Sequence, residues 1–574
     1  TDGLTTMRGI VTRRATDLWV VVVIAAVVGV YATWWTHQDV NSFTLQTHGD
    51  QALIQASAQI AMQSGPFATN PHVGWPSGFN LWSFPATSSL GFYLGAWFLG
   101  LVLDSSANVL SLLMGTTAAA VTAAVYWALR VAPPRPPSRL VSALGAVAMG
   151  LSPYVLSKLG HFNVAAWYLV PMVIAALAIL QRSPTTKRRA AVLLLLVIGG
   201  LLSPLWWSLT SVYALLVGAG VALILRQWQW LSRILSVAGV VVVGAALPAA
   251  LAIANRIPGG SWNRQPWDST LYGGSLTDLL LPSPWLSRLS FGEVEIARAL
   301  SRETSYVGIV IGIAALVAAF ASISAFTGFG SRWAEHRWLF IGTQVVLLAF
   351  LSMGLGVVQE AILAIAGVES PLRVWSRLII VIGLFGLIFT VSWASRWFRR
   401  GWRRSPGGRL AVAIAAVGVS AVILVETAGI QLMTPRTIPD QPETEAVAYL
   451  QQVEEPCPVV QLPVGTFPDF PMADGTPESI TYFYRGFVPY LLDPQGYWSF
   501  GSPAGSDTDR FLRSLPDNID LPVRNELADA GYCAILFDRE YAEWLQRRLG
   551  TWHGLRVIDA QPQWENRRFS IFEL

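Results

Sequence analysis

The side chains best suited to acid–base chemistry in this chain lie between Thr36 and Pro85. This stretch carries three of the six histidines of the chain and two aspartates: His37, His48, His72, Asp39 and Asp50. Thr47-His48-Gly49-Asp50 precedes an apolar run, and Ser or Thr followed three residues later by Asp or Glu is typical of a capped helix N-terminus. A carboxylate at this position can cap the helix, and it can also act as a general base on a substrate hydroxyl. Both roles are compatible with the sequence.

Glutamines recur every four residues after Asp50. They are Gln51, Gln55, Gln59 and Gln63. This spacing places them along one ridge of a helix, with apolar residues on the remaining surface. The pattern predicts a helix in the membrane interface whose glutamines form a solvated face. Binding of sugar hydroxyls by the same glutamines is the alternative.

The composition indicates a helical membrane protein. The chain has 574 residues, of which 53% are hydrophobic and 13% charged, and its mean hydropathy is +0.47. Soluble domains usually have about 25% charged residues. Apolar runs of about 20 residues recur, each long enough to cross a hydrocarbon core roughly 30 Å thick. The net charge of +4 comes from short basic clusters between the apolar runs, a pattern that indicates membrane topology rather than nucleic-acid binding.

The basic clusters predict the orientation of the helices, because Lys and Arg remain on the cytoplasmic side. They lie at residues 8–14, 130–139, 182–189, 226–233, 332–337 and 396–409. With all of them inside, eleven crossings are expected, with a cytoplasmic N-terminus and an extracytoplasmic C-terminus in the plasma membrane. The spans are about 18–36, 107–129, 140–158, 164–181, 190–203, 205–225, 234–254, 304–325, 339–358, 374–395 and 409–430. Ser88–Leu103 is apolar but would invert this order, so we expect it to lie in the outer interface.

We expect two domains. Residues 1–434 form the transmembrane domain, with a first outer loop at 36–106, and residues 435–574 form a soluble extracytoplasmic domain. In the latter, Val459–Val464, Tyr532–Phe537 and Phe569–Leu574 are predicted strands, and Leu521–Ala530 and Arg539–Leu549 are predicted helices, which indicates an α/β or α+β fold. Cys457 and Cys533 each lie next to a predicted strand, and outside the cytoplasm such a pair favours a disulfide over two buried thiols.

Short motifs are spread along nearly the whole chain. The first loop carries Gly49-Asp50, Pro66-Phe67-Ala68-Thr69-Asn70 and Pro76-Ser77-Gly78-Phe79-Asn80-Leu81. Further motifs are Ser152-Pro153-Tyr154, Gly160-His161, Asp278-Leu279-Leu280, Tyr306-Val307-Gly308, Leu372-Arg373, Val460–Val464 and Gln495-Gly496-Tyr497. Together they resemble motifs of the GT-C superfamily of integral membrane glycosyltransferases. More narrowly, the chain is similar to poorly characterised bacterial GT-C-like proteins whose first loop carries GD, then PF-TN, then P-GFNL.

The resemblance implies transfer of a sugar from a polyprenyl-phosphate donor to a cell-envelope acceptor on the outer side, with membrane lipids around the protein. It implies that Asp50 is the catalytic base. A lipid phosphate requires cationic partners, and Arg373 and Arg377, four residues apart, share a helix face. Pairing with Glu369 or lipid headgroups is the alternative for these arginines. His161 is a further candidate for the donor phosphate, although a lone histidine at a helix end is often structural.

The remaining candidates are substrate contacts: His48, Asp39, Asn80, Asn163 and Asp278, with Asp268 and Glu303 as reserves. Metal-dependent relatives carry acidic residues in the second outer loop, where this chain has His161 and Asn163. We therefore predict no obligatory metal and no cofactor. Two other functions compete with the transferase: a non-catalytic envelope assembly or binding protein on the same scaffold, and a lipid or glycan transporter. Few charged residues lie deep in the predicted spans, which counts against a transporter.

Overall fold

The structure, a computed structural model, describes most of the chain. The described residues are 2–36, 50–83, 89–133, 136–158, 161–182, 185–255, 307–326, 377–404, 406–433, 441–453, 457–464, 484–503, 505–516, 518–549, 557–558 and 560–574. They form two compact units. The membrane unit comprises Thr1–Gln38, Ser111–Pro248 and Arg264–Pro435, and the loop–domain unit comprises Asp39–Leu110, Ala249–Asn263 and Arg436–Leu574.

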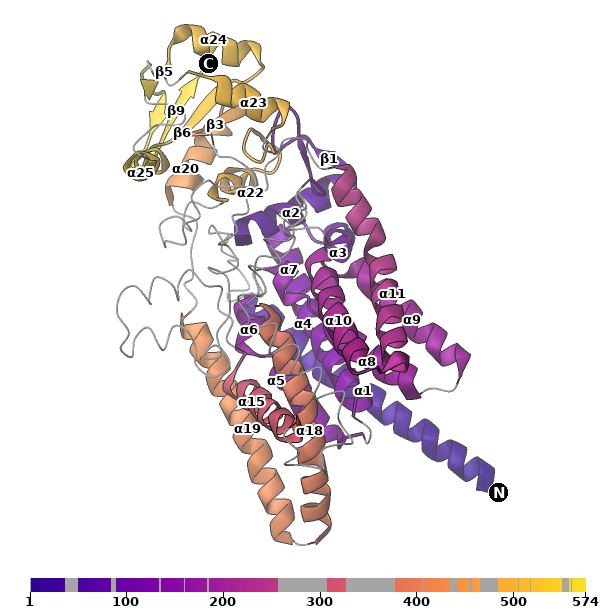
Figure 1. The fold of residues 1–574 in the computed structure, drawn as a ribbon. Coiled ribbons are helices and arrows are strands. Elements are labelled where there is room, and N and C mark those ends of the chain that lie inside the picture. The colour runs from indigo at the N-terminus through magenta and orange to yellow at the C-terminus, as the bar shows by residue number, and fades with distance from the viewer. Residues whose placement is uncertain are drawn as a thin grey trace. The chain divides into compact units, whose positions relative to one another are not determined.

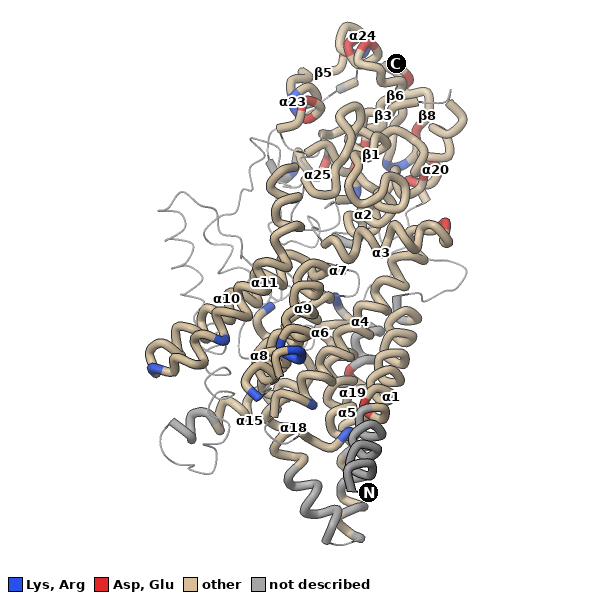
Figure 2. Tube along the Cα trace, turned by 90° about the vertical axis from the view of Figure 1, so that its right-hand side faces the viewer, with Lys and Arg blue, Asp and Glu red and all other residues tan. Residues whose placement is uncertain are grey.

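The membrane unit consists of apolar helices, most of them long (Figure 1). They are α1 (Asp2–Thr36), α4 (Ser106–Val131), α5 (Arg139–Gly150), α6 (Pro153–Ser157), α7 (Phe162–Ala165), α8 (Leu169–Arg182), α9 (Thr186–Leu202), α10 (Leu205–Ile224), α11 (Trp228–Ala254), α15 (Ile309–Phe326), α18 (Leu378–Arg404) and α19 (Pro406–Met433). Six segments in the described residues are long and apolar enough to cross a membrane. Charged residues are sparse along these helices and lie mostly near their ends (Figure 2). The chain is therefore a polytopic helical membrane protein.

Small residues let these helices approach closely. A Cβ atom added at Gly115 of α4 would lie 2.7 Å from the carbonyl oxygen of Gly29 in α1, and one added at Gly244 of α11 would lie 2.6 Å from the carbonyl oxygen of Val197 in α9. In lipid, helix association depends on such close van der Waals packing, because the surrounding hydrocarbon removes the hydrophobic advantage of burial. The glycines are thus part of what holds the bundle together.

Ion pairs join one end of the first helices. Asp17 of α1 lies 3.3 Å from Arg130 at the end of α4 and 2.7 Å from Arg139 at the start of α5. The α1 and α4 helices are therefore antiparallel, and the connection between them begins and ends at the same end of the bundle. The apolar segment predicted at Ser88–Leu103 contains α3 (Leu90–Gly100), whose 11 residues span only about 16 Å. Both observations agree with the expectation that this segment does not cross.

Two predicted spans contain breaks that the sequence pattern did not predict. The span at 140–158 is divided into α5 and α6, because Pro153 begins a new helix and the Ser152 hydroxyl accepts a hydrogen bond from the Val155 amide. The span at 164–181 has a short first turn, α7, before α8 begins at Leu169. The other spans coincide with helices, except that 339–358 lies outside the described residues.

A mixed sheet forms the centre of the loop–domain unit (Figure 1). Its order is β4 (Tyr497–Trp498), β3 (Pro458–Leu462), β6 (Ala534–Asp538), β9 (Phe569–Glu573), β8 (Trp564–Glu565). The β3 strand is parallel to β4 and β6, whereas β9 is antiparallel to β6 and β8. Helices and short strands complete the unit: α2 (Asp50–Ser64), β1 (Thr69–Asn70), β2 (Phe79–Asn80), α3, α20 (Gln441–Leu450), η5 (Arg485–Phe487), α22 (Val488–Leu492), α23 (Asp507–Ser514), β5 (Asn518–Ile519), α24 (Leu521–Asp529), α25 (Arg539–Leu549) and β7 (Val557–Ile558).

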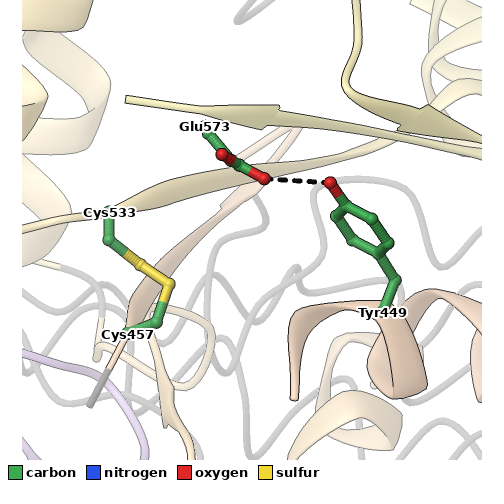
Figure 3. Close-up of a disulfide and its surroundings, with 4 residues drawn as sticks. All are labelled: Tyr449, Cys457, Cys533 and Glu573. Carbon is green, nitrogen blue, oxygen red and sulfur yellow. Dashed lines mark hydrogen bonds between the residues drawn. A yellow bond between two sulfur atoms is a disulfide. The ribbon is translucent and has the colours of Figure 1, made fainter. Parts of the chain in front are cut away.

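The predicted disulfide is confirmed. Cys457 and Cys533 are bonded, with their Cα atoms 5.4 Å apart, and they precede the adjacent parallel strands β3 and β6 (Figure 3). On the other side of β6, the Tyr449 hydroxyl of α20 donates a 2.9 Å hydrogen bond to Glu573 of β9. Buried Val460, Leu462, Ile535 and Phe572 fill the core of the sheet. The sheet is therefore held by covalent, polar and apolar contacts.

The first loop extends this sheet. Val73 bridges to Trp498 of β4 in a parallel arrangement, the Trp498 amide donates to the His72 carbonyl, and the Trp75 amide donates to the Trp498 carbonyl. The Trp75 ring packs edge-on against Tyr532 at 4.9 Å, and the Tyr532 hydroxyl donates to the Trp75 carbonyl. Residues 72–75 thus cover the β4 edge, which would otherwise leave unpaired backbone groups.

Candidate functional site

Asp50 is the first residue of α2. Its side chain, and residues 37–49 before it, lie outside the described residues. A carboxylate in the first turn is favoured by the partial positive charge of the helix N-terminus. The backbone places Asp50 at the start of a helix, and its roles as a cap and as a base stay predictions.

The glutamine ridge of α2 is not a solvated face, so this prediction was wrong. Gln55 is 3% and Gln59 9% exposed. The Gln63 side chain donates to the Pro494 carbonyl at 2.8 Å and accepts hydrogen bonds from Asn70 at 2.9 Å and from the Tyr490 hydroxyl at 2.7 Å. Each amide has two donors and an acceptor, so it can satisfy several buried partners at once. Gln63, at the end of this ridge, joins the first loop to the C-terminal domain.

The first-loop motifs form a small antiparallel hairpin. Thr69 pairs with Asn80 and Asn70 with Phe79. The Asn80 side chain accepts a hydrogen bond from the Trp82 amide at 2.8 Å, so it shapes the turn that follows. The Trp82 indole donates to the Pro66 carbonyl at 2.7 Å. The motifs therefore set the course of the loop, and substrate contact by Asn80 stays a prediction.

An apolar groove lies within the membrane unit. It has about 950 Å³ of empty space between α8, α10, α11 and α18. Thr210, Ala214 and Gly218 line it along α10, and Val381 and Phe385 line it along α18. Residues four apart share a helix face, so each set forms a continuous stripe. From Thr210 to Leu225 the groove follows α10 for roughly 23 Å. A long apolar chain fits such a groove.

A cation lies one helical turn beyond the groove lining. Arg377 directly precedes α18, four residues before Val381, and is 9% exposed. Its guanidinium carbon is 4.6 Å from the ring centroid of Trp206, which in turn is four residues before Thr210. Arginines near membrane-spanning helices are uncommon and often belong to functional sites. An arginine therefore lies next to one end of the groove.

Several buried polar groups lie on α10 and on the segments next to it. Among the buried side-chain atoms of the described residues that have no hydrogen-bond partner are Nε1 of Trp167 and Trp206, and Oγ of Ser203, Ser208 and Ser211. Ser208 and Ser211 belong to α10, and Ser203 lies two residues before its first residue. Ser211 also lines the groove. Buried polar groups in proteins are nearly always hydrogen-bonded. Such donors beside a cation are suited to the oxygens of an anionic headgroup.

The predicted residues of the second outer loop lie beside α10. His161 is the N-cap residue of α7 without a capping bond from its side chain, and Asn163 in the same turn is 3% exposed. The Trp207 indole of α10 donates to the Val164 carbonyl of α7 at 3.2 Å. This contact places the turn carrying His161 next to the residue that follows Trp206.

Other predicted site residues lie outside the described residues. They are Asp39, His48, Asp268, Asp278, Glu303 and Arg373. Within the described part of the chain, no group of three or more His, Cys, Asp or Glu side chains is close enough to hold a metal ion. The contact of Trp206 with Arg377 was not predicted from the sequence. The Ser203-Pro204-Leu205-Trp206-Trp207 stretch, polar and aromatic at the predicted end of a span, was the available signal.

Comparison with known proteins gives a structural likeness only. Neither a family model nor the sequence of a curated protein matches the chain. The Archaeoglobus fulgidus oligosaccharyltransferase, solved with zinc and sulfate, overlaps with a TM-score of 0.51 at 12% identity, covering 91% of this chain and 68% of its own. Its apo form gives 0.48 at 11% identity, with 92% and 70% covered. ArnT from Cupriavidus metallidurans, bound to undecaprenyl phosphate, gives 0.39 at 13% identity, with 98% of both chains covered. The chain therefore shares the fold of this archaeal oligosaccharyltransferase, in agreement with the resemblance to GT-C glycosyltransferases seen in the sequence.

Proposed function

We propose that this protein transfers a sugar from a polyprenyl-phosphate donor to an acceptor of the cell envelope. The observation that carries the proposal is the apolar groove with Arg377 at its end. A polyprenyl phosphate has the same two parts: a long apolar chain and an anionic head. We further propose eleven crossings, with the N-terminus in the cytoplasm and the domain after Pro435 outside, because this arrangement keeps the basic clusters inside.

Arg377 would bind the donor phosphate. Guanidinium groups match phosphate oxygens in geometry and stay charged, and the cation–π contact with the Trp206 ring helps to hold the guanidinium in place. The indole of Trp206 and the hydroxyls of Ser203 and Ser208 would add neutral donors. Arg373 and His161 remain further candidates for the same phosphate.

Asp50 would be the general base. In an inverting displacement, the acceptor hydroxyl oxygen attacks the anomeric carbon while the bond from that carbon to the phosphate oxygen breaks on the opposite face. The hydroxyl proton passes to the Asp50 carboxylate, and the lipid phosphate leaves with the electron pair of the broken bond. The positive charge of Arg377 stabilises the leaving phosphate. His48, Asp39, Asn80, Asn163 and Asp278 are proposed substrate contacts.

The test of the groove is donor binding by Arg377→Gln. Loss of a charge-assisted contact costs about 1.5–3 kcal/mol, so affinity for a polyprenyl phosphate should fall roughly 10- to 150-fold. The variant Arg510→Gln, which removes an exposed arginine on α23, should bind as the wild type does. Thermal unfolding of both variants checks that the fold is intact. Unchanged affinity in a folded Arg377→Gln protein would exclude this arginine from the phosphate site.

A further inference from the structure

The helix that begins at Asp50 is buried along most of its length. Every residue of α2 from Ala52 to Ala61 is buried, so the helix is enclosed on all sides. On one side it packs closely against α3, where a Cβ atom added at Gly100 would lie 2.7 Å from Cγ of Met62. An element fixed in this way can hold a functional side chain more precisely than a loop can.

The last turn of α2 is bonded to the C-terminal domain. The amide nitrogen of Gln63 donates to the Pro494 carbonyl at 2.8 Å. The amide oxygen of the same side chain accepts from the Tyr490 hydroxyl at 2.7 Å and from the Asn70 amide at 2.9 Å. Tyr490 is 1% and Asn70 0% exposed, so both partners are shielded from water. Burial raises the pKa of Tyr490, so its hydroxyl remains protonated and donates.

The segment that bonds the end of α2 is itself fixed to the central sheet. The side chain of Gln461 in β3 donates to the Gly486 carbonyl of η5 at 2.9 Å. The Trp498 indole of β4 donates to the carbonyl of Asp493, directly after α22, at 3.0 Å. Tyr490 lies between these two points in the chain. Hydrogen bonds therefore connect the sheet to the last turn of α2 without a break.

The length of α2 makes this connection important for its first residue. The helix rises by about 20 Å between Asp50 and Gln63. A tilt of about 3° at the Gln63 end would therefore move the backbone of Asp50 by about 1 Å. A misplacement of about 1 Å can lower the rate of an enzyme about 100-fold, because the reacting groups have to be aligned.

We propose that Gln63 and Tyr490 are positioning residues for sugar transfer: they connect the C-terminal domain to α2 and so hold Asp50 in place. The inference rests on the proposed function, because it takes Asp50 as the general base. It gives the C-terminal domain a part in turnover. Neither residue touches substrate in this proposal, and both act through the place of the helix alone.

The experiment compares turnover in two variants of the full-length protein in detergent. Gln63→Leu removes all three hydrogen bonds of the amide, and kcat should fall about 10- to 100-fold. Tyr490→Phe removes one hydroxyl group, and kcat should fall about 2- to 10-fold. The probes are undecaprenyl phosphates carrying radiolabelled glucose, galactose, mannose or arabinose, with total envelope glycan as the acceptor. Affinity for undecaprenyl phosphate should not change, because neither residue lines the groove.

Two matched variants control for a general effect on this unit. Tyr449→Phe removes a hydroxyl that donates to Glu573 at 2.9 Å rather than to α2. Gln452→Leu replaces an exposed glutamine just after α20. Both should turn over at the wild-type rate. Thermal unfolding of all variants checks that the fold is intact, and Tyr490→Phe keeps the test decisive if Gln63→Leu does not fold.

A double-mutant cycle separates positioning from a purely structural role. In the Asp50→Asn background, Gln63→Leu and Tyr490→Phe should lower the residual rate less than about twofold, because the base that they position is gone. A fall by the same factor in both backgrounds, or wild-type kcat in both folded variants, would show the inference to be wrong. Wild-type turnover by Asp50→Asn alone would contradict the proposed base itself, which is a different result from these two.

Discussion

Removal of the disulfide should weaken the sheet of the loop–domain unit. Cys457 and Cys533 are 76 residues apart, and the chain-entropy relation for a loop of this length gives about 4.5 kcal/mol of stabilisation at 25 °C. Measured values are usually lower, about 2–4 kcal/mol, because reduced chains keep residual structure. In the double variant Cys457→Ser/Cys533→Ser, the opening free energy of β3 and β6 should fall by this amount. Their amide hydrogens should then exchange roughly 30- to 700-fold faster.

Hydrogen–deuterium exchange with mass spectrometry on the full-length protein measures this change. The peptides to compare are those of β3 and β6, and α8 in the membrane unit is the internal reference, since its exchange should not change. Ser514→Ala, at an exposed position of the same domain, serves as the control substitution. Unchanged exchange in β3 and β6 would refute the reasoning. Equal acceleration in α8 would show a general loss of stability rather than a local effect.

Two further predictions concern the loop and the topology. Gly78→Ala should lower the thermal unfolding midpoint, because φ is +77° at this residue and an added Cβ would lie 2.6 Å from Thr69 Cγ2 and 2.9 Å from the Asn70 carbonyl oxygen. The expected cost is about 2–4 kcal/mol, and a midpoint equal to that of the wild type would contradict it. In intact cells, a membrane-impermeant maleimide should label an introduced Ser514→Cys but not Pro136→Cys. The opposite pattern would invert the proposed orientation.

Local patterns predicted several elements of the loop–domain unit. Strands at Val459–Val464, Tyr532–Phe537 and Phe569–Leu574 correspond to β3, β6 and β9, and the two predicted helices correspond to α24 and α25. These elements could be predicted because an apolar run bounded by turn residues indicates a strand or helix from only a few neighbouring residues. Most described helices of the membrane unit were also predicted, because twenty consecutive apolar residues have few other structures available in lipid. The breaks before Pro153 and Leu169 were not predicted.

Contacts between distant parts of the chain were not predictable in this way. Nothing in residues 72–75 alone shows that they pair with β4 more than 400 residues later, since edge pairing depends on backbone groups that every residue has. The burial of Gln55 and Gln59 could not be predicted for a similar reason. An amphipathic pattern shows which residues share a helix face, but not which other part of the chain covers that face. The pairing of Glu443 with Arg485 and of Asp538 with Arg568 also arises only in the folded sheet.

Arg377 was a sequence candidate because it shares a helix face with Arg373 and a lipid phosphate requires a cationic partner. Its contact with the Trp206 ring became visible only in the structure. The groove itself is formed by four helices that are far apart in the sequence, so no local pattern indicated it. Asn80, a candidate from its motif, has a local structural contact to the Trp82 amide.

The most direct test of the central proposal is sugar transfer by Asp50→Asn. Asparagine has nearly the shape of aspartate and is also a good residue at a helix N-terminus, so it removes basicity while keeping the start of α2. A general base acts in the transition state, and its loss should lower turnover about 10²–10⁴-fold with donor affinity and thermal stability unchanged. A variant that folds, binds donor and transfers sugar at the wild-type rate would contradict the proposal and direct the search for the base to Asp39 or Asp278.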